Sequence, residues 1–370
     1  MSHPIKLPGS WTHEGLVLSR RHDGGSSDVA GDPCIVWDEA IPGWRMFLFF
    51  DPPGCGQAVC LNGTSVGSGQ WTFLGPLSFT NPEDMIHGGL HKPSIVTIAD
   101  HPHQAARVDG LYWLLAVTHA PKRIQRAWSE RLAGPWTLEK GALIPAGSPE
   151  DFDGKHADAV TGVFFPGREE FLYFYMGYPS SPQPLQPSSL FGSAQGAASQ
   201  RPGQKAATKL GVILPPHSRP GHWASGWVGG LQLLPGAEHR WLGLLNASPT
   251  PVDPQNPAVW SEEPAPSLGG FAWCDEEWPV KNWHWFANPL EWIEDLPREA
   301  VLNGEQTNLW RHYLLRLDTG RLALFYNSGS YGQEQLYWKL GAPGPREALY
   351  FLGETPDQPL KALEKLKASW

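Results

Sequence analysis

Short apolar runs separated by turns that contain Pro or Gly recur along the whole chain, and they occur in pairs. In the clearest pair, an apolar run at residues 159–165 is followed by the turn Pro166-Gly167 and a second run at 171–175. Runs of this length, bounded by turn residues, indicate two antiparallel β-strands joined by a tight turn. One acidic residue, Asp158, stands at the entrance of the first strand.

The same layout occurs in four more places. The further pairs lie at residues 34–37 with 44–50, 95–98 with 111–117, 227–234 with 240–245, and 312–317 with 321–326. The five units begin near residues 32, 92, 158, 226 and 312, and each is about 60 to 85 residues long, a period that suggests a repeat architecture. Paired strands repeated at this spacing predict the blades of a β-propeller.

We therefore predict an all-β protein, a single five-bladed β-propeller over residues 1–370 with about four antiparallel strands per blade. The polar residues 1–27 are expected to wrap the edge of the first or last blade. Two stretches interrupt the repeat and are interpreted as insertions. Residues 179–208, rich in Pro, Ser, Gln, Gly and Ala, are typical of a lid or a disordered flap, and we favour the flap. The Trp-rich residues 260–308 are predicted to include a short helix at 288–301.

Composition supports a folded core and narrows the class of partner. Hydrophobic residues make up 41% of the chain and charged residues 18%, which argues against disorder. The net charge is −9 and no basic stripe is visible, so nucleic acid is not an expected partner. The chain has neither an apolar run of about 18 residues nor the apolar core of a signal peptide, so we expect a cytoplasmic protein without a membrane partner. The oligomeric state is left open.

Tryptophan and cysteine usage add two expectations. The 19 Trp are far above ordinary usage, and indole rings serve large cores as well as carbohydrate sites, where flat sugar faces stack on them. The four Cys show no CxxC spacing, so neither a metal site nor a cofactor is predicted. Free thiols are expected in preference to a Cys55–Cys60 bridge.

Three short motifs resemble glycoside hydrolase family 43. Residues 129–137, with the turn Ala133-Gly134-Pro135-Trp136, are similar to a strand-turn signature that recurs in that family. Asp32-Pro33 before an apolar strand resembles the family's first-blade acid, and the segment from His156 to Ala159 resembles its third-blade acid. The resemblance, shared with the related families 32, 117 and 130, implies a five-bladed propeller and a glycosidase acting on a short oligosaccharide or glycoside.

The family's three catalytic carboxylates transfer only in part. The resemblance implies that Asp32 is the general base and that Asp158 orients the substrate. The family's general acid, a Glu at the start of blade four, has no counterpart, because no acidic residue lies between Glu170 and Glu238. His222 is the candidate proton donor instead, since an imidazole titrates near neutral pH.

Further site candidates follow from propeller geometry, in which the mouths of the inner strands converge on one central pocket. His91 and His156 are candidates for binding sugar hydroxyls, and Lys92 for pairing with Asp32 or Asp158 or for binding an anionic substrate group. If the predicted insertion at 260–308 folds over the pocket, Glu276 and Glu277 become alternative proton donors. The candidate substrate-binding residues are His91, Lys92, His156, Trp223, Arg311, His312, Glu276 and Glu277.

Three functions remain open from the sequence. The first is a glycoside hydrolase that acts on a small carbohydrate substrate with Asp32 and Asp158 in the central pocket. The second is a glycoside phosphorylase, because related propellers with that activity lack the usual Glu and hold phosphate with basic residues, for which Lys92, His91 and Arg311 are candidates. The third is a carbohydrate-binding propeller without catalysis. The missing Glu disfavours the first function, and the two aspartates disfavour the third.

Overall fold

The computed structural model describes residues 4–21, 29–50, 54–61, 66–67, 70–86, 89–119, 122–180, 193–219, 222–248, 267–290, 309–317, 319–329 and 334–342. Within these ranges the chain is almost entirely β-structure, with one short 3₁₀ helix, η1 (Pro82–Asp84). No helix within the described ranges is long and apolar enough to cross a bilayer. The four cysteines are buried and free. The predicted helix at 288–301 lies largely outside the described residues.

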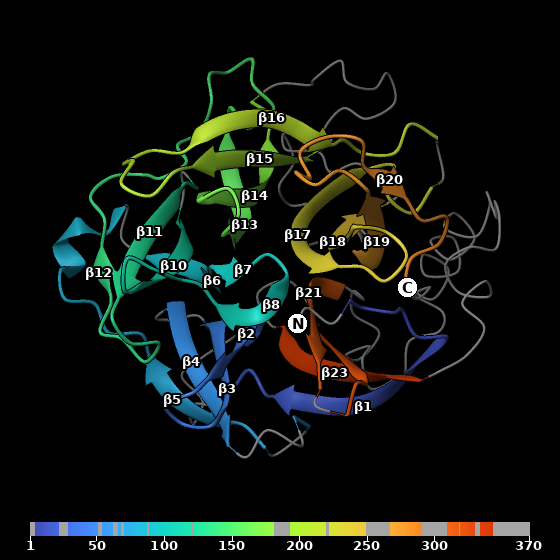
Figure 1. The fold of residues 1–370 in the computed structure, drawn as a ribbon, viewed down its shortest axis with the longest axis horizontal. Helices are drawn as coiled ribbons and strands as arrows, with labels where there is room; N and C mark the ends of the chain where they lie inside the picture. The colour runs from blue at the N-terminus through green and yellow to red at the C-terminus, as the bar shows by residue number, and fades with distance from the viewer. Residues whose placement is uncertain are drawn as a thin grey trace.

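Five sets of four antiparallel strands surround a common centre (Figure 1). Blade one consists of β2 (Gly31–Asp38), β3 (Gly43–Phe50), β4 (Gly54–Leu61) and β5 (Thr72–Pro76). Blade two consists of β6 (Leu90–Ile95), β10 (Leu111–Thr118), β11 (Ile124–Ser129) and β12 (Thr137–Leu138), with β9 (Arg107–Val108) beside β10. Blade three consists of β13 (His156–Phe165), β14 (Glu170–Tyr178), β15 (Ala194–Gln200) and β16 (Thr208–Leu214).

Blade four consists of β17 (Trp227–Pro235), β18 (Trp241–Ser248), β19 (Leu268–Cys274) and β20 (His284–Trp285). Blade five consists of β21 (Leu309–Arg316), β22 (Leu322–Ser328), β23 (Gln335–Ala342) and β1 (Ser10–Leu18). The N-terminal strand β1 thus forms the edge of the last blade, one of the two positions predicted for residues 1–27. This arrangement confirms the predicted all-β propeller class.

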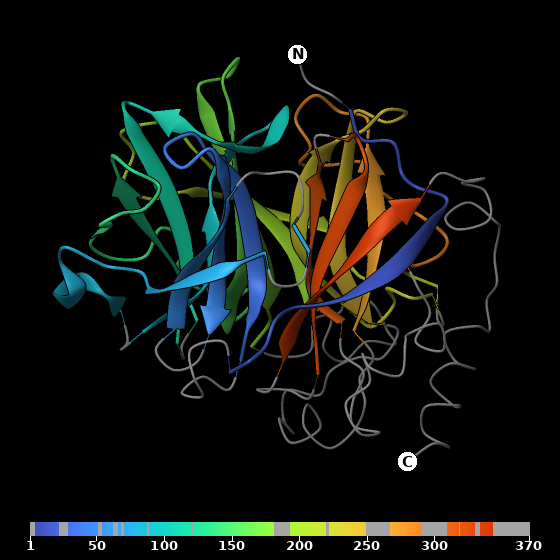
Figure 2. The same cartoon turned by 90° about the horizontal axis from the view of Figure 1, so that it is seen from below.

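One end of the central axis is covered by a hairpin. Strands β7 (Thr97–Ile98) and β8 (His101–Ala105) follow β6 and lie across the centre in Figure 1. β7 pairs with the late part of β13, and β8 pairs with Trp37 near the end of β2. Figure 2 shows this hairpin at one end of the molecule. The opposite end, where the inner strands β2, β6, β13, β17 and β21 begin, is where their first side chains meet.

Aromatic side chains pack between neighbouring blades. Trp136 of the loop before β12 meets Phe47 of blade one with ring centroids 6.0 Å apart. Trp241 of blade four meets Phe165 of blade three at 5.6 Å, and Trp71 beside blade one meets Phe325 of blade five at 6.2 Å. Each such contact adds about 0.5–1.5 kcal/mol to the free energy gained by burial. Part of the high Trp content therefore serves the core.

The two predicted insertions contain strands of the blades. β15 lies within 179–208 and is the third strand of blade three, while β19 and β20 lie within 260–308 and complete blade four. The interpretation as insertions was wrong for these strands: β15 consists of small and polar residues that resemble loop composition, and β19 and β20 lie in a Trp-rich stretch that interrupts the repeat pattern. The small residues are needed for close packing: a Cβ at Gly196 would lie 2.1 Å from the ring of Phe152, and one at Gly270 would lie 2.2 Å from that of Trp223. Residues 181–192, 261–266 and 291–308 lie outside the described residues.

Candidate functional site

Every inner strand carries a β-bulge near its start, where its register against the second strand shifts. One residue of each bulge has a left-handed backbone, and the five are Asp32 (φ 51°), Lys92 (φ 52°), Ala159 (φ 50°), Gly230 (φ 73°) and Arg311 (φ 48°). This conformation costs a non-glycine residue about 1–2 kcal/mol. Bulges re-aim side chains, and strained backbone tends to cluster at functional sites. The repeated bulge therefore indicates that the candidate functional site lies at this end of the axis.

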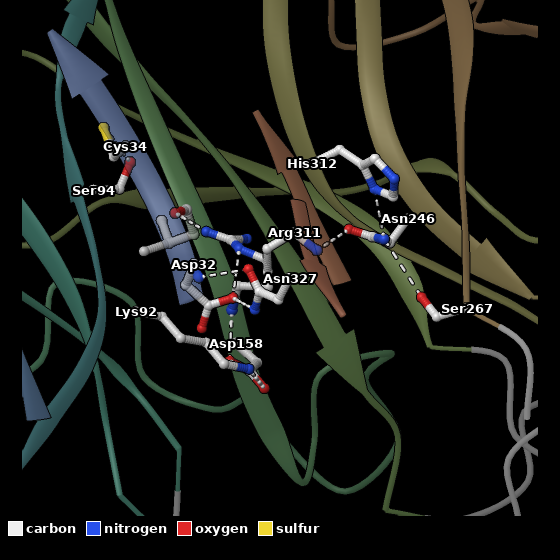
Figure 3. Close-up of polar contacts among 12 residues, drawn as sticks. Asp32, Cys34, Lys92, Ser94, Asp158, Asn246, Ser267, Arg311, His312 and Asn327 are labelled. Atoms are coloured by element: carbon white, nitrogen blue, oxygen red, sulfur yellow. Dashed lines mark hydrogen bonds and ion pairs between the residues drawn. The ribbon is translucent and has the colours of Figure 1, made fainter. Parts of the chain in front are cut away.

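Charged side chains from four blades meet at these bulges. Figure 3 shows Asp32 of β2, Lys92 of β6, Asp158 of β13 and Arg311 of β21 pointing toward one another. Lys122, in the loop between β10 and β11, joins them. We call these five residues the axial cluster. The cluster contains three cations and two carboxylates, so its formal charge is 3 − 2 = +1, whereas the whole chain carries −9.

Asp158 is the buried anchor of the axial cluster. Its side chain is fully buried, and Lys92 Nζ lies 3.0 Å from Oδ1 and 3.1 Å from Oδ2. Lys122 Nζ lies 2.5 Å from Oδ2, and the backbone N–H of Ala159 donates to Oδ1 at 2.7 Å. These four contacts use the lone pairs that a carboxylate offers.

Electrostatics keep this carboxylate ionised. Burial alone would raise the pKa of Asp158, but Lys122 and Lys92 outweigh it and hold that pKa well below its usual range. For Lys92, burial opposes the charged form, yet Asp158 and Asp32 raise its pKa above the ordinary lysine value. For Lys122, burial dominates, with repulsion from Lys92, and its pKa falls despite the attraction of Asp158. The two lysine side chains remain 22% and 26% exposed.

Asp32 is held differently. Its side chain is 5% exposed, and its Oδ1 lies 3.5 Å from Arg311 Nε and accepts from Asn327 Nδ2 at 3.4 Å. Asn327 Oδ1 in turn accepts from the backbone N–H of Asp32 at 2.9 Å. Among the described residues, no hydrogen bond or ion pair reaches the other carboxylate oxygen, Oδ2. Asp32 therefore keeps one oxygen available for chemistry.

A neutral polar layer supports Arg311 from blade four. Asn246 Oδ1 accepts from the backbone N–H of Arg311 at 2.7 Å, while Asn246 Nδ2 lies 3.0 Å from His312 Nδ1. His312 is buried, which lowers its pKa to about 3, and stacks on Tyr326. Its hydrogen bond is to Asn246 and not to a residue of the axial cluster. The predicted site residue His312 thus supports the bulge of β21.

The other two predicted histidines lie beside the lysines. His91 is buried, and desolvation together with Lys92 lowers its pKa to about 2. His156 Nδ1 accepts from the backbone N–H of Lys122 at 3.3 Å, and burial lowers the pKa of His156 to about 4. Both imidazoles are therefore neutral near pH 7 and leave the cationic character of the site to the lysines and Arg311.

The predicted proton donor lies elsewhere. His222 stacks on His217 with centroids 3.8 Å apart and contacts Trp285 of the outer strand β20. Burial lowers the pKa of His222 to about 3, so the ring carries no dissociable proton of the required acidity at neutral pH. Trp223 is fully buried and donates its indole N–H to Phe286 O at 3.1 Å. Among the described contacts, His222 packs on His217 and Trp285 and Trp223 bonds to Phe286, and none joins either residue to the axial cluster. Their roles in proton donation and substrate binding stay predictions.

Glu276 and Glu277 lie at the wrong end of the propeller for a role in this site. They follow β19, whose last residue, Cys274, pairs with Trp241, which in turn pairs with Pro235 at the end of β17. The axial cluster is formed by residues at the beginnings of the inner strands, so the length of a blade separates the two. Glu276 instead accepts a hydrogen bond from Asn282 Nδ2 at 2.5 Å within its own turn. The predicted role in proton donation or substrate binding is therefore corrected.

Three residues that shape the site were not predicted from the sequence. Lys122, Asn246 and Asn327 lie in a loop or in second strands, so no position in the repeat pattern distinguishes them. The sequence Pro121-Lys122-Arg123 has the composition of a solvated turn. Within the described ranges, no group of three or more His, Cys, Asp or Glu side chains is arranged to hold a metal ion.

Comparisons with known proteins rest on the fold. No family model and no curated protein sequence matches this chain. A thermostable family-43 glycoside hydrolase superposes with a TM-score of 0.57 at 12% identity over 87% of this chain and 94% of that chain. The catalytic domain of a GH62 α-L-arabinofuranosidase from Coprinopsis cinerea gives 0.56 at 11% identity over 91% and 97%. An endo-1,4-β-xylanase from Bacteroides thetaiotaomicron gives 0.54 at 10% identity over 91% and 97%. These similarities establish a shared propeller fold.

Proposed function

We propose that this protein is an O-glycosyl hydrolase that cleaves a short oligosaccharide or glycoside at the axial cluster of a single propeller domain. The solved structures that share its fold include a glycoside hydrolase, an arabinofuranosidase and a xylanase. The observation that carries the proposal is the state of Asp32. Its carboxylate is buried at the open ends of the inner strands, fixed through Oδ1, and without a partner at Oδ2 among the described residues.

In the proposed reaction Asp32 is the general base. Its Oδ2 takes a proton from a water molecule as the water oxygen bonds to the anomeric carbon and the glycosidic C–O bond breaks. The departing oxygen leaves with the bonding electron pair and takes up a proton from solvent water. Arg311 and Asn327 hold Asp32 through Oδ1 and so aim Oδ2 at the water.

Asp158 has a positioning role in this mechanism. Its oxygens are already occupied by two ammonium groups and one backbone N–H, so it holds the lysines in place while their remaining N–H groups donate to the substrate. No further carboxylate of the described residues contacts the axial cluster. Substrates whose leaving groups depart without protonation are therefore expected to react best.

The test is the activity of Asp32→Asn on a panel of 4-nitrophenyl glycosides. Loss of a general base should lower kcat by about 10²- to 10⁴-fold. Glu277→Gln is the matched control, because this exposed acid lies at the other end of blade four, and it should leave kcat unchanged. Full activity of Asp32→Asn would remove Asp32 from the base role, and failure of the wild-type protein to cleave any glycoside would refute hydrolysis.

A second candidate function, phosphorolysis, is favoured by the surplus cation of the axial cluster, since inorganic phosphate would then replace water as the nucleophile. The measurement that separates the two is cleavage with and without phosphate. Hydrolysis releases free sugar at a rate independent of phosphate, whereas phosphorolysis requires phosphate and yields a sugar phosphate. The non-catalytic alternative predicts sugar binding without any turnover.

A further inference from the structure

The two lysines that hold Asp158 form an ammonium pair around a single carboxylate. Lys92 and Lys122 each contact Asp158 within 3.1 Å, and together the three groups carry a formal charge of 2 − 1 = +1. Asp32 and Arg311 pair with each other at 3.5 Å and add no net charge. The neighbouring His91 and His156 are neutral, because burial lowers their pKa values to about 2 and about 4. Among the described residues, one positive charge of the site is thus uncompensated.

The lysines also retain donors that no group among the described residues uses. Lys122 Nζ has one hydrogen-bond partner among the described residues, a carboxylate oxygen of Asp158, and Lys92 Nζ bonds only to the two oxygens of that same carboxylate. An ammonium group carries three N–H donors. Because the side chains are 22% and 26% exposed, the unused donors are within reach of solvent and of a bound molecule.

Asp158 cannot take the place of the lysines as the group that faces a substrate. It has no exposed surface and already accepts four hydrogen bonds. A neutral sugar is usually held by carboxylates and amides that accept from its hydroxyl groups, whereas ammonium groups can only donate. At this side of the axis the protein therefore presents donors and positive charge, which complement an oxyanion better than a hydroxyl group.

We propose that Lys92 and Lys122 bind an anionic substituent of the sugar, so that the substrate class is acidic glycosides: sugars that carry a carboxylate, or a sulfate or phosphate ester. This inference deepens the proposed function, since it names the substrate of the same site. Asp158 positions the two ammonium groups, and the pair adds a specificity determinant to the hydrolysis that Asp32 carries out.

The first experiment measures binding without turnover. Titration calorimetry with glucuronate and galacturonate, against glucose and galactose, should give a preference of at least tenfold for the acids, equivalent to about 1.4 kcal/mol. The preference should shrink as salt rises, because exposed charges are screened. In Lys122→Met it should fall to less than threefold, and Lys122→Arg should keep it. Lys140→Met, a substitution of an exposed lysine elsewhere in blade two, is the control. Equal affinity for acids and neutral sugars, or a preference that survives Lys122→Met, would overturn the inference.

The second experiment compares cleavage of paired 4-nitrophenyl uronides and neutral glycosides in both anomeric forms. Faster cleavage of uronides that depends on Lys122 supports the inference. Cleavage of neutral glycosides alone, dependent on Asp32, overturns the inference and leaves the proposed function intact. A Lys122-dependent preference for acids in calorimetry without any cleavage refutes hydrolysis but supports the anion site. Cleavage that requires inorganic phosphate and is equally fast for uronides and neutral glycosides would mean that the lysines bind phosphate and not a substituent of the sugar. This result overturns the inference.

Discussion

Replacement of Asp158 by Asn removes one negative charge from the centre of the propeller while keeping the size of the side chain. The substitution leaves Lys92 and Lys122 without the carboxylate that separates them, and both ammonium groups then face each other and Arg311. An Asn side chain can still accept through its amide oxygen, but its NH₂ group points a donor at a lysine donor. The variant is therefore expected to be less stable than the wild-type protein, and its cationic site to be poorly ordered.

The magnitude follows from the burial of the ion pair. Removing one partner of a buried salt bridge costs about 3–5 kcal/mol, because the remaining charge stays desolvated. Asp158 is fully buried, whereas the lysine side chains are 22% and 26% exposed. Water can partly solvate the orphaned ammonium groups, so the cost should lie near the lower limit, about 3 kcal/mol.

The dependence on pH has a definite sign. The pKa of Asp158 lies well below its usual range in the folded protein. Its contribution is therefore fully present above the unfolded-state pKa of about 3.9 and is lost as pH falls through the folded-state pKa. The difference in stability between wild type and Asp158→Asn should be constant from about pH 5 to pH 8 and should narrow below about pH 4.

Urea denaturation followed by Trp fluorescence measures this difference. The double variant Asp158→Asn/Lys122→Met should be more stable than Asp158→Asn alone, because it removes one of the two repelling charges, and the coupling between neighbouring residues is about 0.5–3 kcal/mol. Glu277→Gln should stay within about 0.5 kcal/mol of wild type, as is usual for surface substitutions. A free energy of unfolding for Asp158→Asn equal to that of this control, or no gain in the double variant, would refute the ionic anchor.

Three more predictions test the surroundings of the cluster. Gly230→Val should lower both the melting temperature and kcat, because Gly230 has φ 73° and a Cβ there would lie 3.2 Å from Arg311 Nη1. Gly211→Val is the control and should lower only the melting temperature, because Gly211 has φ 84° and nothing lies within 4 Å of its Cβ position. Equal losses of kcat in the two variants would contradict a role for the contact with Arg311. His222→Ala should leave the ratio of kcat/KM on activated and unactivated glycosides unchanged, because its pKa of about 3 leaves it neutral; a selective loss on unactivated substrates would reinstate it as the acid. Asn246→Leu should destabilise the protein by about 1–3 kcal/mol in urea titrations, since it leaves the part-buried backbone N–H of Arg311 without its acceptor, and a neutral effect would show that the bond is dispensable.

Much of the fold could be predicted because its signal is local. Paired apolar runs bounded by turns are visible in the sequence, and the inner strands begin at Gly31, Leu90, His156, Trp227 and Leu309, within three residues of the predicted starts. The strand β15 was missed because Ala, Gly, Ser and Gln replace the usual β-branched residues there, and β19 was missed because it lies in the Trp-rich stretch that was interpreted as an insertion. Glycine is needed in these strands because the rings of Phe152 and Trp223, which come from other segments, pack directly against their backbone. Sequence pattern alone carries no information on that approach.

The site was predictable only where a residue stood at the mouth of an inner strand. Asp32, Lys92, Asp158 and Arg311 satisfy that condition, and all four belong to the axial cluster (Figure 3). Lys122 reaches the cluster from a loop, and its role depends on a contact of 2.5 Å with Asp158 that no spacing rule contains. His222 has the right position in the sequence, but the chain turns its ring outward toward His217 and Trp285.

The two aspartates show why position in a repeat does not fix a role. Asp32 occupies the left-handed residue of its bulge, whereas in blade three that residue is Ala159 and the acid comes one position earlier. This one-residue offset gives the two carboxylates different environments. Asp158 is buried and forms ion pairs with two lysines, so its negative charge holds these cations in place. Asp32 is fixed through a single oxygen and keeps the other free among the described residues. A general base needs an oxygen without a partner, whereas a carboxylate that anchors two lysines uses both oxygens. The one-residue offset therefore accounts for the proposed difference in role between Asp32 and Asp158.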